Sequence, residues 1–226
     1  ERRFGFRSFA VDKSDGFATL RLNGERIVLR SAISWGFWPV TGLVPSPELA
    51  RRQVEDARSL GLNMLNHHRT IAASGLLDVQ DELGLLAYCE PGGYATHGGD
   101  AFCKALAREK LLRMVRRDRS HPSVVIWNLI NEETAEPTEE QRRDLLEAHA
   151  LDPSRVMTFT SGWSKDGDDP LKLHARPFDP ELHTEGWSDN HNAPGPGVWR
   201  DEFWRSPTDY LRRSENRGEI VFWGEE

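Results

Sequence analysis

Hydrophobic and polar positions at the start of the chain alternate with a period of two. The alternation covers residues 1–11 and continues over residues 16–29, where Asn23 and Gly24 interrupt it. This period is typical of half-exposed strands, and Asn-Gly is a preferred two-residue hairpin turn. The pattern predicts a short antiparallel lead-in.

From about residue 27 the pattern changes to short apolar strands that alternate with amphipathic helices. Ser46 before Pro47 predicts the start of a helix over residues 46–60, and Thr138 with Gln141 predicts a capping box for residues 138–150. Further helices are expected over residues 76–83, 100–119 and 206–214. The strands that follow the one near residue 27 are expected over residues 63–65, 85–88, 123–130, 156–160, 183–188 and 219–223. Repeated strand–helix units predict a parallel sheet, here with seven βα-type strands.

The strand over residues 123–130 is the most informative of these. It is almost entirely apolar, as expected for a strand covered on both faces, and it ends in Asn131, Glu132 and Glu133. In α/β barrels the active site lies at the carboxyl ends of the strands. This position therefore predicts chemistry at the end of the strand.

Composition narrows the class of partner. The 226 residues include 36 acidic and 29 basic ones, a net charge of -7, with no basic stripe for nucleic acid and no cationic anchor for a membrane. Cys89 and Cys103 lack metal-ligand spacing, and we expect two free thiols. The chain begins without Met or a signal peptide and stops just after a strand, so we expect a piece of a longer protein, of unknown compartment.

Two predicted strands end in a pair of glutamates, Glu132–Glu133 and Glu225–Glu226, which should reach the same edge of the sheet. Two carboxylates on either side of a glycosidic bond can hydrolyse it, one as acid and the other as nucleophile or base. Acidic residues at strand ends are also common as solvated or ion-paired groups, and the pattern alone does not choose.

Several motifs resemble the catalytic module of glycoside hydrolase family 2, the retaining β-galactosidases, β-glucuronidases and β-mannosidases. They are RFGFRSF, LNGERIVLR, RSHPSVVIWNLINE and the terminal IVFWGEE. The resemblance implies an α/β fold, a (β/α)8 TIM barrel over residues 27–226 that is truncated after strand seven. Residues 1–26 would end a preceding β-sandwich domain.

The resemblance also implies roles. Glu132 matches the family's general acid/base, Glu225 its nucleophile, and Asn131 the amide that contacts the 2-hydroxyl of the sugar. We therefore expect a retaining exo-β-glycosidase that forms a covalent glycosyl-enzyme, with Glu132 protonated and Glu225 ionised at the start.

Other candidate substrate contacts come from loops and strand ends. Relatives carry Arg and Ser-His where this chain has Asn66, His67, His68 and Arg69, so the charges are shifted in register. Adjacent histidines on an extended segment point in opposite directions and no third ligand is evident, so no metal and no cofactor are expected. Glu90 is expected mainly to support its neighbours. The substrate-binding candidates are Trp35, His67, His68, Arg69, Glu90, Trp163, Trp187, Asp189 and His191.

Alternatives remain at this point. A catalytically silent carbohydrate-binding barrel or an endo-acting polysaccharide hydrolase would share the motifs, whereas a metal hydrolase lacks a ligand cluster. The expected partner is a carbohydrate, without nucleic acid or membrane, and a homo-oligomer is left open. If the sugar is a uronic acid, Arg69, Arg176 or Arg200 would pair with its carboxylate.

Overall fold

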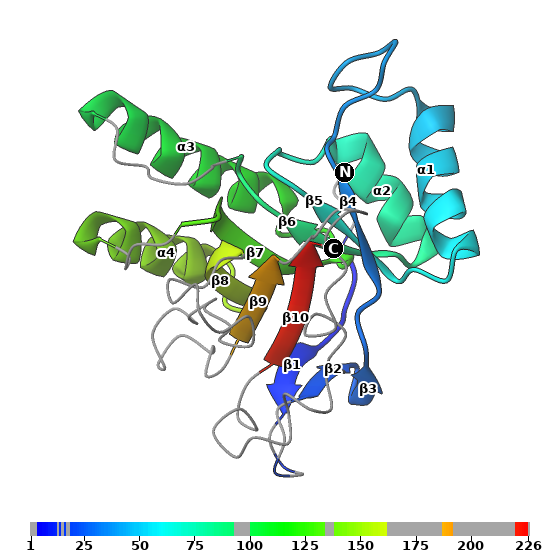
Figure 1. The fold of residues 1–226 in the computed structure, drawn as a ribbon, viewed down its shortest axis with the longest axis horizontal. Helices are drawn as coiled ribbons and strands as arrows, with labels where there is room; N and C mark the ends of the chain where they lie inside the picture. The colour runs from blue at the N-terminus through cyan, green and yellow to red at the C-terminus, as the bar shows by residue number, and fades with distance from the viewer. Residues whose placement is uncertain are drawn as a thin grey trace, which may run out of the picture.

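A parallel sheet with helices on one of its faces dominates the computed structural model of the chain (Figure 1). The strand order is β4-β5-β6-β7-β8, so consecutive strands are neighbours, as in an opened barrel. These strands are β4 (Ser31–Ser34), β5 (Met64–His67), β6 (Leu86–Cys89), β7 (Val124–Asn131) and β8 (Val156–Ser161). The structure describes residues 4–12, 14, 16, 19–92, 100–133 and 138–161, and the backbone of the strands over residues 187–191 and 220–225.

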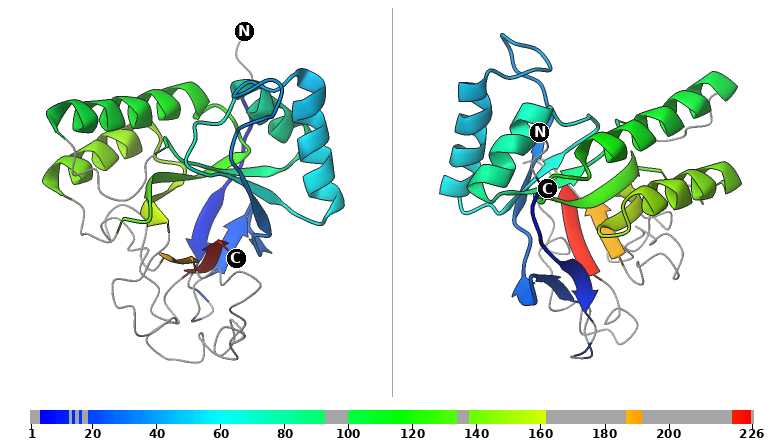
Figure 2. Two further views of the ribbon diagram at one scale, coloured as in Figure 1. Left: turned by 45° about the horizontal axis from the view of Figure 1, so that its top comes forward. Right: turned by 180° about the vertical axis from the view of Figure 1, so that it is seen from behind.

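All four described helices lie on the same side of this sheet (Figures 1 and 2). Ser46 caps the first helix by accepting the Leu49 N–H at 3.3 Å, and Thr138 and Gln141 form the predicted capping box of the last. The two helix starts predicted from the sequence are therefore confirmed. The helices are α1 (Pro47–Ser59), α2 (Ser74–Leu83), α3 (Ala101–Asp118) and α4 (Glu139–Leu151).

The lead-in forms a three-stranded antiparallel sheet against the other face of the parallel sheet. Its strands are β1 (Phe9–Asp12), β2 (Thr19–Leu22) and β3 (Glu25–Ile27). Asn23 and Gly24 have φ angles of 53° and 83°, which fits the predicted hairpin turn. The buried side chains of Phe9 and Leu20 pack in one cluster with residues of the parallel strands. The lead-in thus shares a core with the barrel strands.

Two strand predictions need correction. The first parallel strand is β4, whereas the residues near 27 close the hairpin as β3. The second parallel strand, β5, extends to His67, although the strand was expected to cover residues 63–65. All four residues of β5 are buried, because the strand lies between β4 and β6 and side chains pack against it on both faces of the sheet. Asn66 and His67 therefore belong to a buried strand although their side chains are polar.

The last two described strands, β9 (Trp187–His191) and β10 (Ile220–Glu225), pair in parallel, and β9 lies next to β8 (Figure 1). Both are shifted towards the C-terminus from their predicted positions, β9 by a few residues. The helix predicted over residues 206–214 lies outside the described residues. None of the described helices is long and apolar enough to cross a membrane.

Candidate active site

The carboxyl end of β7 presents Asn131 and then Glu132. All eight residues of β7 are buried, so the position of its end is set by packing on both faces. Glu132 is half-buried and has a φ of 54°, a left-handed conformation that costs about 1–2 kcal/mol for a residue with a Cβ. Its N–H donates to the Ser161 carbonyl at 2.7 Å. Strained backbone of this kind occurs preferentially at functional sites.

The neighbouring glutamate differs from Glu132 in its surroundings. Glu133 is 6% exposed, and its N–H donates to the Thr160 hydroxyl at 2.9 Å. Of the two, Glu132 combines the unusual backbone conformation with partial access to solvent. The structure thus distinguishes two glutamates that are equivalent in the sequence pattern.

A buried polar network surrounds the side chain of Asn131. Its Oδ1 accepts the Ser161 hydroxyl at 2.9 Å, and the Ser161 hydroxyl in turn accepts Asn128 Nδ2 at 3.2 Å. Asn128 Oδ1 accepts the Thr158 hydroxyl at 2.7 Å. These residues come from β7 and β8, so the network fixes the facing ends of two adjacent strands.

Glu90, directly after β6, extends the network to a third strand. The side chain is fully buried, with Oε1 3.3 Å from the Ser161 hydroxyl and 3.8 Å from His68 Nδ1. Its Oε2 accepts the N–H of Arg69 at 3.0 Å. Since these bonds join the segments after β5 and β6 to β8, Glu90 supports its neighbours in this structure.

Trp35 and Arg69 form an accessible rim next to this network, where Trp35 contacts the buried ring of His68. The His68 and Trp35 rings meet edge-to-face with centroids 4.7 Å apart, and the Arg69 guanidinium carbon lies 5.7 Å from the Trp35 ring centroid. Trp35 is 55% exposed, while His68 is buried. An exposed aromatic face beside a cation is suited to the apolar face of a sugar and to an anionic substituent.

His67 does not belong to this group. Its Nε2 lies 2.7 Å from Gln80 Oε1 of α2, on the helix side of the sheet. Burial lowers the pKa of His67 to about 4, so the ring is neutral near pH 7. The structure thus gives His67 a packing role between β5 and α2, in contrast to the substrate contact that we expected.

The remaining candidates stand only partly within the described structure. Trp163 lies outside the described residues. Trp187, Asp189 and His191 lie on β9 and Glu225 on β10, where the backbone alone is described, with Glu225 opposite His191 in the register. The role of Glu225 as the nucleophile therefore stays a prediction.

Sequence reasoning missed the polar residues that hold Asn131. Asn128 lies inside a run otherwise made of apolar residues, and Thr158, Thr160 and Ser161 share a strand. A buried amide requires hydrogen-bond partners, so Asn128 was the available signal. Which hydroxyls it meets depends on the register of β7 and β8, with Asn128 opposite Thr158 and Asn131 opposite Ser161.

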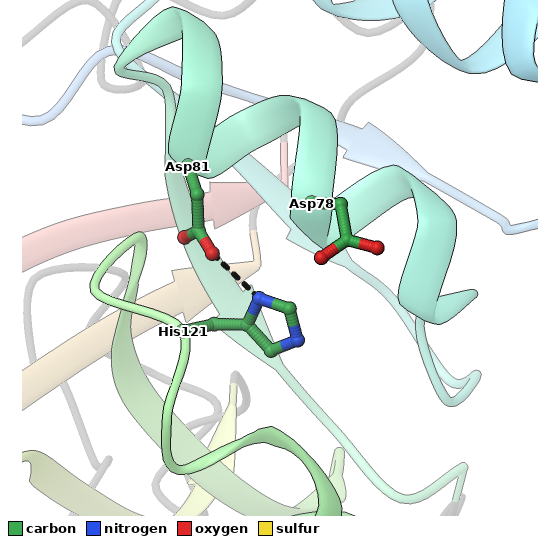
Figure 3. A group of neighbouring side chains, drawn as sticks. All are labelled: Asp78, Asp81 and His121. Carbon is green, nitrogen blue, oxygen red and sulfur yellow. Dashed lines mark hydrogen bonds and ion pairs between the residues drawn. The ribbon is translucent and has the colours of Figure 1, made fainter. Parts of the chain in front are cut away.

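A second cluster, Asp78, Asp81 and His121, lies near the amino end of β7 (Figure 3). Its potential ligand atoms lie within 4.8 Å of one another. Asp81 already contacts His121 Nδ1 through Oδ2 at 2.6 Å and accepts the Ser123 N–H through Oδ1 at 2.9 Å. This arrangement connects α2 to the segment that precedes β7, and we assign it a structural role.

Comparison with known sequences identifies relatives of this chain. Residues 66–185 match the family model described as glycosyl hydrolases family 2, TIM barrel domain. A β-galactosidase of Thermoanaerobacterium thermosulfurigenes is 31% identical over 157 residues, which are 69% of this chain and 21% of that protein. A putative β-glucuronidase of Formosa agariphila is 30% identical over 175 residues, 73% of this chain and 16% of that protein. The chain thus spans about a fifth of the length of these relatives.

Solved structures agree with this result. The β-glucuronidase of Parabacteroides merdae superposes with a TM-score of 0.61 at 27% identity, over 69% of this chain and 21% of that one. A family 2 β-galacturonidase of Eisenbergiella tayi, bound to galacturonate, gives a TM-score of 0.70 over 96% of this chain and 38% of that one, and at 19% identity it supports the fold alone. The chain belongs to glycosyl hydrolase family 2 and carries its TIM barrel domain.

Proposed function

We propose that the protein containing this chain is a retaining exo-β-glycosidase and that this chain carries both catalytic carboxylates. One observation carries the proposal: the Asn131–Glu132 pair stands at the carboxyl end of a fully buried strand, with a strained Glu132 backbone, in a family 2 barrel. Barrel enzymes place their catalytic groups at this edge. The activity of the whole protein is part of the proposal, because the chain spans about a fifth of its relatives.

Glu132 acts as the general acid. It protonates the oxygen of the leaving group while Glu225 attacks the anomeric carbon, so the glycosidic bond breaks as the glycosyl–Glu225 ester forms. Glu132, now ionised, removes a proton from water, which attacks the anomeric carbon and releases Glu225. The net configuration is retained because the carbon is inverted twice. This route requires the two carboxyl groups to lie roughly 5–5.5 Å apart.

The substrate in this proposal is a terminal β-linked sugar. Asn131 bonds its 2-hydroxyl, and Trp35 supplies an apolar surface beside the charge of Arg69. The relatives named above are β-galactosidases and β-glucuronidases, which supports a neutral hexose or a uronic acid as the sugar. A cation at the rim favours the uronic acid of these two.

The test is a panel of nitrophenyl β-glycosides and unactivated disaccharides, applied to the full-length protein. Glu132→Ala should lower kcat/KM on disaccharides by roughly 10²–10⁴-fold and much less on nitrophenyl glycosides, whose leaving group needs no proton. Glu225→Ala should abolish the hydrolysis of both substrates. Glu133→Ala is the matched control and should keep near-wild-type kcat.

Added azide separates the roles of the two glutamates. In Glu132→Ala, azide should intercept the glycosyl-enzyme and give a β-glycosyl azide. In Glu225→Ala, azide should replace the nucleophile and give the α-glycosyl azide. The proposal fails if both variants stay active, if the first product of the wild type is the α-anomer, or if the wild type cleaves only internal bonds of a polysaccharide. A folded protein that binds oligosaccharides without any turnover would indicate a binding module.

A further inference from the structure

We propose that Ser161 is a positioning residue, whose hydroxyl orients the amide of Asn131 and whose carbonyl holds the backbone of Glu132. This inference rests on the proposed function. Ser161 is the last residue of β8, is fully buried and stands opposite Asn131 in the register. Ser161 therefore contacts both residues that would meet the sugar, the side chain of Asn131 and the backbone of Glu132.

The hydroxyl of Ser161 has a defined set of partners. It accepts Asn128 Nδ2 at 3.2 Å, and its single hydrogen can be donated to Asn131 Oδ1 at 2.9 Å or to Glu90 Oε1 at 3.3 Å. The shorter contact favours donation to Asn131. Since Oδ1 is occupied by this bond, the Nδ2 group of Asn131 points away from Ser161 and can donate to a sugar hydroxyl.

The backbone carbonyl of Ser161 holds Glu132. It accepts the Glu132 N–H at 2.7 Å, directly after the strand ends. Glu132 has a φ of 54°, and a residue stays in this conformation only where its surroundings hold it. The bond to Ser161 is such a restraint, and it decides the direction in which the carboxylate leaves the strand.

Ser161 is itself held in place from two sides. Asn128 donates to it while also donating to the Ile130 carbonyl at 2.6 Å and accepting from Thr158. Glu90 lies on the other side of the hydroxyl and is bonded to the backbone of Arg69. A hydroxyl enclosed in this way has little freedom to rotate, so its effect on Asn131 is preorganised.

The test uses substrates with and without a 2-hydroxyl. Hydrogen bonds to this hydroxyl strengthen in the transition state of glycosidases. Ser161→Ala should therefore lower kcat about tenfold with little change in KM on the 2-hydroxy glycoside. On the matching 2-deoxy glycoside the loss should be at most two- to threefold, of the order expected for a small rearrangement. Ser161→Thr, which keeps a hydroxyl, should recover most of the activity, and Ser123→Ala, a buried serine at the other end of β7, is the control.

A double variant tests the route of the effect. Ser161→Ala combined with Asn131→Ala should be no slower than Asn131→Ala alone, because both changes remove the same contact. Equal losses on the 2-hydroxy and 2-deoxy substrates, or additive losses in the double variant, would overturn the inference. Either result would mean that Ser161 contributes only to folding.

The amide orientation is also measured without turnover. In NMR spectra of the full-length protein, the signals of the Asn131 side-chain amide protons should shift in Ser161→Ala, and these protons should exchange faster with water. In Ser161→Thr both the signals and the exchange rate should stay near wild type. Unchanged signals in Ser161→Ala would overturn the inference even in a protein without activity. Failure of the proposed function is separate, because it would appear in the wild type and in Glu132→Ala before Ser161 is altered.

Discussion

The two ends of strand β7 are both polar, but they are built differently. At the amino end, the guanidinium of Arg155 is 2.6 Å from Asp152 Oδ2 and donates to the carbonyls of Val124 and His121 at 2.9 and 2.7 Å. At the carboxyl end, by contrast, amides and hydroxyls surround Asn131, and Glu132 has a strained backbone. One end pairs opposite charges; the other presents a carboxylate.

The lead-in completes the amino end. The guanidinium of Arg7 donates to the carbonyls of Pro122, Ser154 and Val124 at 2.8–3.2 Å. Burial, with a smaller effect from the charge of Arg155, lowers the pKa of Arg7 to about 10, so it stays charged near pH 7. In barrels the amino-terminal face serves stability and the carboxyl-terminal face serves catalysis. The difference between the ends follows this division.

The largest expected effect on stability comes from the amino end. Arg155→Met leaves Asp152 buried without its cation and should lower the free energy of unfolding by about 3–5 kcal/mol. The kcat of the remaining folded protein should be unchanged. Denaturant unfolding and turnover at a temperature below the transition measure both quantities.

Arg51→Met is the control for this change, because it removes an exposed ion pair with Glu82 and should cost about 0–1 kcal/mol. A similar small loss in Arg155→Met, or a kcat as low as that of Glu132→Ala, would show that the two ends do not divide stability and turnover as described.

A smaller effect tests the strain at the carboxyl end. Glycine adopts positive φ freely, so Glu132→Gly should be about 1 kcal/mol more stable than Glu132→Ala. At an ordinary helical position the order reverses, and Glu109→Gly in α3 should be less stable than Glu109→Ala by about 1 kcal/mol. Thermal unfolding of the four variants measures this. If Glu132→Gly is the less stable variant of its pair, the carboxyl end of β7 stores no strain.

The smallest expected effect is the pH dependence of the Asp81–His121 pair. Partial burial lowers the pKa of His121, but the hydrogen bond and charge of Asp81 outweigh it and raise the pKa above 6.5. The pair therefore stabilises the fold fully below about pH 6.5 and less as the pH rises through the folded-state pKa. The difference in the free energy of unfolding between wild type and His121→Gln should therefore shrink as the pH rises.

Unfolding at a series of pH values measures this difference for wild type and His121→Gln. The comparison also removes the opposite contribution of His67, which is the same in both proteins. Because the pKa of His67 is about 4 in the folded protein, the fold loses stability as the pH falls below 6.5. A difference that grows with rising pH would contradict the assignment of His121 to this pair.

Local signals were sufficient for much of the fold. The Asn23–Gly24 turn, the Ser46 cap and the Thr138–Gln141 capping box depend on bonds between residues close in the chain, and the structure has all three. The continuous apolar run of β7 likewise identified a strand that is buried along its whole length. The polar end of β5 was assigned incorrectly, because its burial comes from α2 and the flanking strands.

For the candidate site, the sequence by itself determined that Asn131 and Glu132 follow a buried strand, since a long apolar run followed by polar residues is a local pattern. Only the tertiary structure decided which groups hold them. Ser161 is 30 residues away from Asn131 and meets it because adjacent strands are in a particular register. Glu90, 41 residues away from Asn131, contacts the hydroxyl of Ser161. Register depends on how a whole sheet packs, and no short stretch of sequence records it.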